Sequence, residues 1–272
     1  GQIGTLTNSG TLGGVQFGVN NRGTIGTLLN SGRITNNNFT ALWNQGSIGL
    51  LTNSGTITNS SWAILNTGTV GTLTNSGVIS GAGNAIQNNG VITLINNSGT
   101  LSGGSNAVAG TFGTIINSGI IKGDINKNGG RIDTIIGGSG GTIGTLIGFN
   151  GTTLGTFGAS SNLVFASGDL LLHDNIVAKS IAASALTVSN LGANITLSTI
   201  VNVDGNYTQT GGSLNLGNSG QLVVSQAASI TGGTILAGAA GLSSTASYMY
   251  GATGSTLVSG GAGSNYTGVS LT

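Results

Sequence analysis

The chain contains no cysteine and no proline among its 272 residues, and charged residues make up only 4% of it. Without cysteine no disulfide can form, which suits a chain that crosses a periplasm unfolded. With 6 Lys plus Arg, 5 acidic residues and a net charge of +1, the surface lacks the basic footprint that nucleic acids and anionic lipids require. No run of about 18 apolar residues occurs. We therefore expect no nucleic-acid partner and no membrane insertion by this segment.

Groups for acid–base chemistry are equally scarce. All five acidic residues are Asp and none is Glu, whereas glycoside hydrolysis needs a pair of carboxylates. The only histidine, His173, precedes Asp174 and follows the apolar residues 170–172, and this position is typical of a surface turn rather than of a catalytic triad. Calcium-binding nonapeptide repeats need Asp where this chain has Asn. We expect no catalytic residues, no metal site and no cofactor.

What the chain has in abundance is a repeat. The tripeptide Asn-Ser-Gly occurs six times in the first 120 residues, at steps of 22, 23, 22, 22 and 20 residues. Its asparagines are Asn8, Asn30, Asn53, Asn75, Asn97 and Asn117. A repeat of this length cannot bury a core alone and must stack on its neighbours as one rung of a solenoid.

Apolar residues recur at fixed distances from these asparagines. Three columns are apolar in all six copies; they begin at Ile3, Leu6 and Leu12. A fourth column consists of Val19, Leu42, Ile64 and Ile86. Between the columns lie Gly, Asn, Ser and Thr, which form turns. Each copy thus predicts about three short strands with their apolar side chains inward.

This pattern predicts an all-β parallel β-helix. Gly makes up 53 residues and helix-forming Glu and Lys are almost absent, so a helical or leucine-rich repeat is disfavoured. We expect residues 1–130 to form the regular part, with rungs of 20–23 residues, and residues 131–272 to continue the same β-helix less regularly. At about 22 residues a step the chain would make about twelve rungs. Neither end has an obvious polar cap, so we expect the polypeptide to continue at both ends.

Asparagine forms a second repeated column. Besides the six asparagines of Asn-Ser-Gly, a set of four precedes the next Gly of each copy by two residues: Asn21, Asn44, Asn66 and Asn88. Stacked asparagines can form ladders of side-chain amides. The ten residues are interpreted either as such structural ladders or as a polar adhesive strip.

Two other groups of residues are candidate partner-binding sites. Phe17, Phe39 and Trp62 each follow their Asn by nine residues, with Trp43 close by. They predict a column of aromatic rings that is either core at a wide corner or an exposed patch for protein or sugar. The second group gathers charge within twelve residues, as a solvated turn or as a contact for a partner or an anionic sugar. It consists of Lys122, Asp124, Lys127, Arg131 and Asp133.

The repeats also resemble a known family. Residues 68–79 read Gly-Thr-Val-Gly-Thr-Leu-Thr-Asn-Ser-Gly-Val-Ile, similar to repeats in the passenger domains of bacterial type V autotransporters. Residues 204–216 resemble the segment shortly before the membrane barrel of such proteins, and residues 256–261 resemble the region that closes the passenger. The resemblance implies a right-handed parallel β-helix on the bacterial cell surface, exported through a C-terminal barrel outside this sequence.

Passengers with few charges and no cysteine are often adhesins. The resemblance therefore implies cell–cell aggregation, biofilm formation or host attachment, with another copy of the chain, a host protein or a glycan as partner. Two alternatives stay open at this point. One is a β-helix that binds or cleaves polysaccharides, and the other is an ice-binding solenoid, for which the threonine columns at Thr5 and Thr7 are interrupted by Leu, Asn and Ile.

Overall fold

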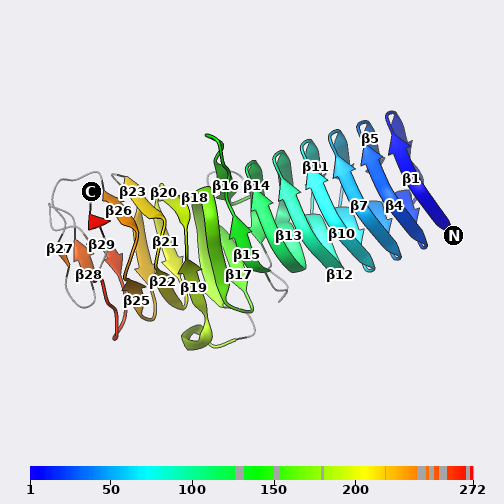
Figure 1. The fold of residues 1–272 in the computed structure, drawn as a ribbon. Coiled ribbons are helices and arrows are strands. Elements are labelled where there is room, and N and C mark those ends of the chain that lie inside the picture. Colours follow the sequence, from blue (N-terminus) through cyan, green and yellow to red (C-terminus); the bar gives the residue numbers. More distant parts are fainter. Residues whose placement is uncertain are drawn as a thin grey trace.

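The structure is a computed structural model that describes residues 1–125, 132–149, 154–178, 181–217, 219–237, 243–244, 248–250, 256–267 and 270–271. It is a parallel β-solenoid of about 10 turns, drawn as a long rod with the chain ends at opposite ends (Figure 1). The predicted all-β parallel fold is confirmed. The one helical element described is the 3₁₀ turn η1 (Ala183–Ala185), and no described helix has the length and apolarity to cross a membrane.

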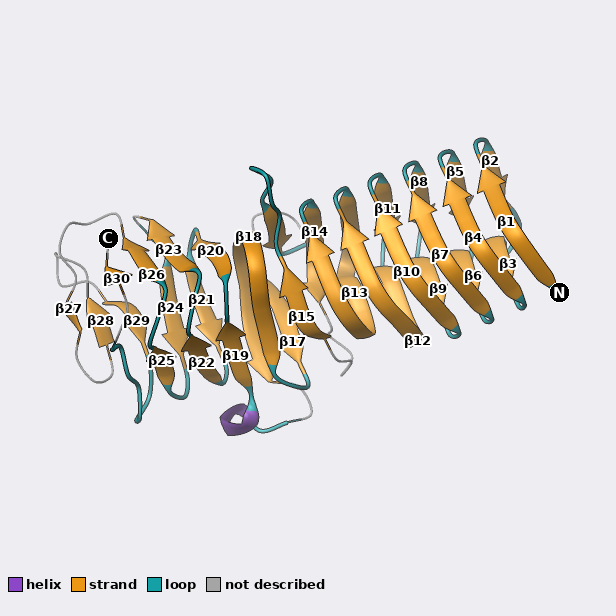
Figure 2. Ribbon diagram, in the orientation of Figure 1, coloured by secondary structure: helices purple, strands orange, loops and turns teal. Residues whose placement is uncertain are grey.

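The regular part of the rod consists of three strands per rung (Figure 2). The first strands of the rungs are β1 (Gln2–Asn8), β4 (Thr24–Asn30), β7 (Ser47–Asn53) and β10 (Thr69–Asn75). The second are β2 (Thr11–Gly13), β5 (Arg33–Asn36), β8 (Thr56–Asn59) and β11 (Val78–Gly81). The third are β3 (Phe17–Asn21), β6 (Thr40–Asn44) and β9 (Trp62–Asn66). Strands of one kind pair in parallel, so the rod has three faces in this part.

The strands of the next rungs vary in length from 4 to 18 residues. They are β12 (Asn84–Asn97), β13 (Thr100–Asn117), β14 (Ile120–Ile125), β15 (Ile132–Ile136), β16 (Gly144–Ile147), β17 (Gly155–Ala159) and β18 (Leu163–Ala178). Strand β13 pairs with β15, and β14 pairs with both β16 and β17. Hydrogen-bonded pairing therefore continues across residue 130, where the repeat loses its regular step.

The remaining strands lie toward the C-terminal end of the rod (Figure 1). They are β19 (Thr187–Asn190), β20 (Ala193–Leu197), β21 (Ile200–Val203), β22 (Asn206–Gln209), β23 (Ser213–Gly217), β24 (Gln221–Val224), β25 (Ala228–Ile230), β26 (Thr234–Ala237), β27 (Ser243–Ser244), β28 (Tyr248–Tyr250), β29 (Thr256–Ser259) and β30 (Ser270–Leu271). Strands β27, β28 and β29 pair antiparallel. The expected twelve rungs were too many, because several later turns are longer than 22 residues: Ile121 pairs with Leu146, and Leu222 with Val258.

The core lies on the axis of the rod and is built from the four apolar columns. Ile25, Leu28 and Ile34, which represent the first three columns in the second rung, are at most 2% exposed. The fourth column pairs in register, Val19 with Leu42 and Leu42 with Ile64. Because each rung covers the apolar side chains of its neighbour, burial is complete only when copies stack.

Glycine in Asn-Ser-Gly is required by the closeness of stacked turns. The N–H groups of Ser54 and Gly55 both donate to the carbonyl of Asn30 in the rung before, at 2.9 and 3.1 Å. A Cβ atom on Gly55 would lie 2.1 Å from the carbonyl oxygen of Gly32. Only glycine allows the two backbones to approach so closely.

Candidate functional site

Two ladders of asparagine amides run along the regular part of the rod. In the first, the Nδ2 atom of each Asn-Ser-Gly asparagine donates to the Oδ1 atom of the next at 2.7–2.8 Å, from Asn8 to Asn117. In the second, Asn21, Asn44, Asn66 and Asn88 are joined in the same way. All ten side chains are buried. Because they do not reach the surface, the adhesive-strip interpretation does not fit them.

The aromatic residues gather on the third face of the rod, near its N-terminal end. The ring of Phe39 contacts all three others, with centroids 5.7 Å from Phe17, 5.5 Å from Trp43 and 6.0 Å from Trp62. The Phe17 and Trp43 centroids are 5.2 Å apart. We call these four side chains the aromatic corner. Phe39 is 40% exposed and the other three are half-buried, so the corner lies outside the core.

The rings of Phe17, Phe39 and Trp62 lie next to one another on consecutive rungs, but the backbone of Phe39 is one residue out of register with the other two. Phe17 pairs with Thr40, and Thr40 pairs with Trp62. Thr40 is fully buried, and its hydroxyl donates to the Trp62 carbonyl at 2.9 Å. The extra residue lies in a turn before Thr40, where the Asn36 Oδ1 atom accepts the N–H of Phe39 at 3.0 Å. This turn places Phe39 outward, between the rings of the neighbouring rungs.

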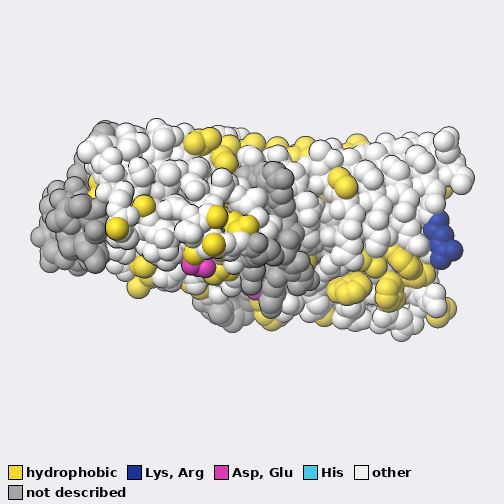
Figure 3. All heavy atoms as spheres, turned by 90° about the horizontal axis from the view of Figure 1, so that it is seen from below, with side chains coloured by type: hydrophobic (Ala, Val, Ile, Leu, Met, Phe, Trp, Pro, Cys, Tyr) yellow, Lys and Arg dark blue, Asp and Glu magenta, His cyan; other side chains and the backbone are white. Residues whose placement is uncertain are grey.

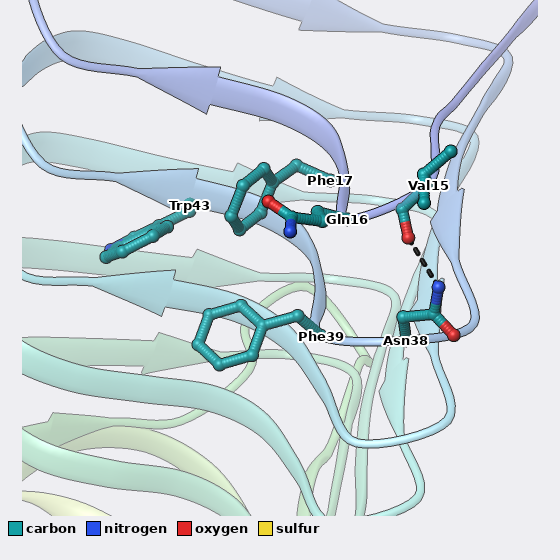
Figure 4. Close-up of a pocket in the computed structure, with 6 residues that line it drawn as sticks. All are labelled: Val15, Gln16, Phe17, Asn38, Phe39 and Trp43. Atoms are coloured by element: carbon teal, nitrogen blue, oxygen red, sulfur yellow. Dashed lines mark hydrogen bonds between the residues drawn. The ribbon is translucent and has the colours of Figure 1, made fainter.

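An open pocket of about 420 Å³ lies against this corner. It is lined by Val15, Gln16, Phe17, Asn38, Phe39 and Trp43. The three rings extend to one side of the two stacked turns that carry Val15 and Asn38, and the Asn38 Nδ2 atom donates to the Val15 carbonyl at 2.5 Å (Figure 4). No lining residue is charged. Figure 3 shows hydrophobic side chains gathered near this end of the rod, with dark blue basic groups only at its tip.

The charged group is only partly within the described residues. Lys122 and Asp124 lie on β14 with half-exposed side chains, and the Asp124 Oδ1 atom accepts the N–H of Thr156 at 3.2 Å. Lys127 and Arg131 lie outside the described residues. Asp133 belongs to β15, and its side chain is not among those described.

The surface turn predicted at His173 and Asp174 is wrong, because both residues belong to the 16-residue strand β18. Neighbouring side chains in a strand point to opposite faces. His173 is half-exposed, and its Nδ1 atom lies 3.2 Å from the Ser198 hydroxyl. Asp174 is instead 1% exposed and points into the rod. A serine–histidine pair is present, but the neighbouring carboxylate lies on the other face of the strand and does not orient the imidazole.

Asp174 is the residue that the sequence did not single out. Among the residues that the structure describes, neither of its carboxyl oxygens finds a hydrogen-bond partner. Burial raises the pKa of Asp174 to about 7, and the negative charge of Asp124 adds to the rise. The backbone N–H of Gly155 acts in the opposite direction and lowers the pKa, although it does not form a full hydrogen bond with the carboxyl. In the described part of the chain no three His, Cys, Asp or Glu side chains group as metal ligands would.

The outer side of the first face carries the two threonine columns. Thr5 pairs with Thr27, Thr27 with Leu50 and Leu50 with Thr72. Leu50 therefore interrupts this threonine column at the position expected from the sequence. The neighbouring column is interrupted by Leu29, which stacks between Thr7 and Thr52. This face mixes methyl and hydroxyl groups and is not a uniform threonine array.

In comparisons with known proteins, no family model, no curated protein and no solved structure matches the chain.

Proposed function

We propose that this chain is the rod-shaped passenger of a bacterial type V autotransporter and acts as a non-catalytic adhesin at the cell surface. The observation that carries the proposal is the aromatic corner, in which four aromatic side chains from three consecutive rungs are held on the outside of the rod. Exposed aromatic clusters are typical of interaction sites. Here the cluster stands on a surface with almost no charge, so contacts through it would not depend on electrostatic attraction.

The rod supplies the stiffness that an adhesin needs. Backbone pairing is continuous from β1 to β26, and the buried amide ladders tie each regular rung to the next through side chains as well. A binding site near one end is then carried at a fixed place along the rod. The repeat architecture, with its autotransporter-like Gly-Thr-Ile-Gly-Thr-Leu-Thr-Asn-Ser-Gly rhythm, supports display outside the cell.

A cell-mixing assay tests this proposal. The chain is displayed on bacteria behind a neutral outer-membrane barrel, and labelled displaying cells are mixed with unlabelled displaying cells or with bare cells. Clumps made only of displaying cells would establish self-association, and clumps that recruit bare cells would indicate a heterologous ligand. Cells that neither clump nor attach to a host-cell or glycan-coated surface would contradict the adhesin function.

A further inference from the structure

Resting on the proposed function, we propose that the aromatic corner is a carbohydrate-binding site that takes a neutral sugar chain. Its binding residues are Phe39, Trp43 and Phe17, with Gln16 as a hydrogen-bonding partner. The argument uses the chemistry of these side chains, their exposure and the size of the pocket.

The pocket is lined mainly by two kinds of side chain, aromatic rings and amides. Phe17, Phe39 and Trp43 offer aromatic rings on one side, the Gln16 amide lies beside the Phe17 ring, and Asn38 lies on the other side next to Val15 (Figure 4). A pyranose ring has the matching character, since its C–H groups form an apolar face while its hydroxyl groups project from the edge. Aromatic rings pack on the apolar face, and amides both donate to and accept from hydroxyl groups.

The Gln16 amide is available for a ligand. Its side chain is exposed, and among the described residues it makes no hydrogen bond. The Asn38 amide is used within the protein, because its Nδ2 atom donates to the Val15 carbonyl and holds the edge of the pocket. A purely apolar partner would have to bury the Gln16 amide without replacing the water bound to it, which is unfavourable. The hydroxyl groups of a sugar avoid that cost.

The charge of the lining residues and the volume of the pocket indicate which class of ligand can bind. None of the six lining residues is charged, so nothing compensates the carboxylate of an acidic sugar or the phosphate of a nucleotide. The volume of about 420 Å³ falls in the lower part of the range for small-molecule pockets, roughly 300–1,000 Å³. The pocket is open to the outside, which allows a chain of sugars to extend past it.

Tryptophan fluorescence can report binding at this site. Its two tryptophans, Trp43 and Trp62, both belong to the aromatic corner, and only Trp43 lines the pocket. In the variant Trp62→Phe, all tryptophan fluorescence comes from the pocket wall. We would titrate this variant with cellohexaose, maltohexaose and chitohexaose, and with hexagalacturonic acid as the charged comparison.

We expect at least one neutral hexasaccharide to change the fluorescence saturably. Adding Phe39→Ala is expected to weaken binding about tenfold or more, because it removes the most exposed ring, and Gln16→Ala to weaken it severalfold. Phe149→Ala is the matched control, since Phe149 is also exposed, at 54%, and does not line the pocket; it should bind as the parent does. Circular dichroism melting of each variant checks that the fold is unchanged.

Three outcomes would overturn the sugar site. They are the lack of any saturable response to the neutral sugars, an equal response with and without Phe39, and a stronger response to the acidic sugar. If Phe39→Ala instead abolished sugar-independent clumping in the cell-mixing assay, the corner would bind a second copy of the chain. This result would support the adhesin function and contradict the sugar-binding site.

Discussion

A buried polar residue of the regular part and one of the irregular part differ in how they are satisfied. In the regular part, Asn53 is fully buried, and its amide is hydrogen-bonded to the asparagines of the rungs before and after it. In the irregular part, Asp174 is almost as buried and completes no hydrogen bond. A repeated residue meets its own copy at the right distance, so its partner is supplied by the repeat. Where the repeat is lost, each polar group needs a partner of its own, and Asp174 lacks one.

The substitution Asp174→Asn should break this contrast most strongly. The folded protein keeps Asp174 protonated up to about pH 7, whereas the unfolded chain releases that proton near its ordinary pKa of about 4. The folded state therefore binds more protons between these values, and its stability falls as pH rises from about 4 to about 7, by at most about 4 kcal/mol.

Thermal melts across this pH range would measure the effect. The parent should lose stability as pH rises, and Asp174→Asn, which carries no charge, should remove most of that slope and melt higher at pH 8. Asp169→Asn serves as the control because Asp169 lies on the same strand and is half-exposed. An unchanged slope in Asp174→Asn would show that the carboxyl ionises normally.

Gly55→Ala should show how closely the regular turns are stacked. The added Cβ atom would meet the Gly32 carbonyl oxygen at 2.1 Å, so one of two stacked turns must move, at a cost of about 3 kcal/mol. Gly10→Ala is the matched control, since Gly10 also ends an Asn-Ser-Gly but has no atom within 4 Å of the added Cβ. Equal melting temperatures for the two variants would contradict the steric argument.

Asn53→Ala should test the ladder itself. It removes the Oδ1 acceptor of Asn30, whose Nδ2 atom keeps only its longer bonds to the Gly32 and Thr56 carbonyls, and it removes the Nδ2 donor to the Oδ1 atom of Asn75. We expect a loss of about 2 kcal/mol in the free energy of unfolding, measured by urea denaturation. The exposed Asn37, changed to Ala, should have an effect within about 0.5 kcal/mol. Similar losses in both variants would mean that the ladder adds nothing to stability.

Tyr207→Phe should give the smallest effect, in the irregular part. The Tyr207 hydroxyl is buried and donates to the Gln209 Oε1 atom at 2.9 Å, and the Asn190 amide approaches the same oxygen at 3.5 Å. Because one donor stays near that oxygen, we expect a loss of only about 1 kcal/mol by the same urea measurement. A loss as large as that of Asn53→Ala would show that irregular rungs depend on single bonds as much as ladders do.

Much of the fold could be predicted because identical residues stack. The three apolar columns and the Asn-Ser-Gly period set the register that β1, β4, β7 and β10 adopt. The position of Phe39 could also have been found: counted back from Asn44 instead of forward from Asn30, the residue aligned with Phe17 and Trp62 is Thr40. The inserted residue therefore lies between Asn30 and Asn44.

The inward side chain of Asp174 could not be predicted in the same way. A histidine and an aspartate after three leucines resemble the end of a strand, whereas β18 continues for four residues beyond Asp174. Nothing in the local pattern shows this, because the strand is held by its parallel neighbours: Asp174 pairs with Gly155 and Ile176 with Phe157. Only the absence of a Cβ atom at Gly155 leaves room for the carboxyl, since a Cβ there would lie 2.0 Å from its Oδ1 atom.

The two ladders give the rod a direction. Every amide along them donates toward the rung that follows in the sequence, so each ladder is a polar chain with oxygen atoms facing one way and N–H groups the other. Aligned amide dipoles strengthen one another. A folded rung therefore acts as a template on which the next rung can add in a single orientation.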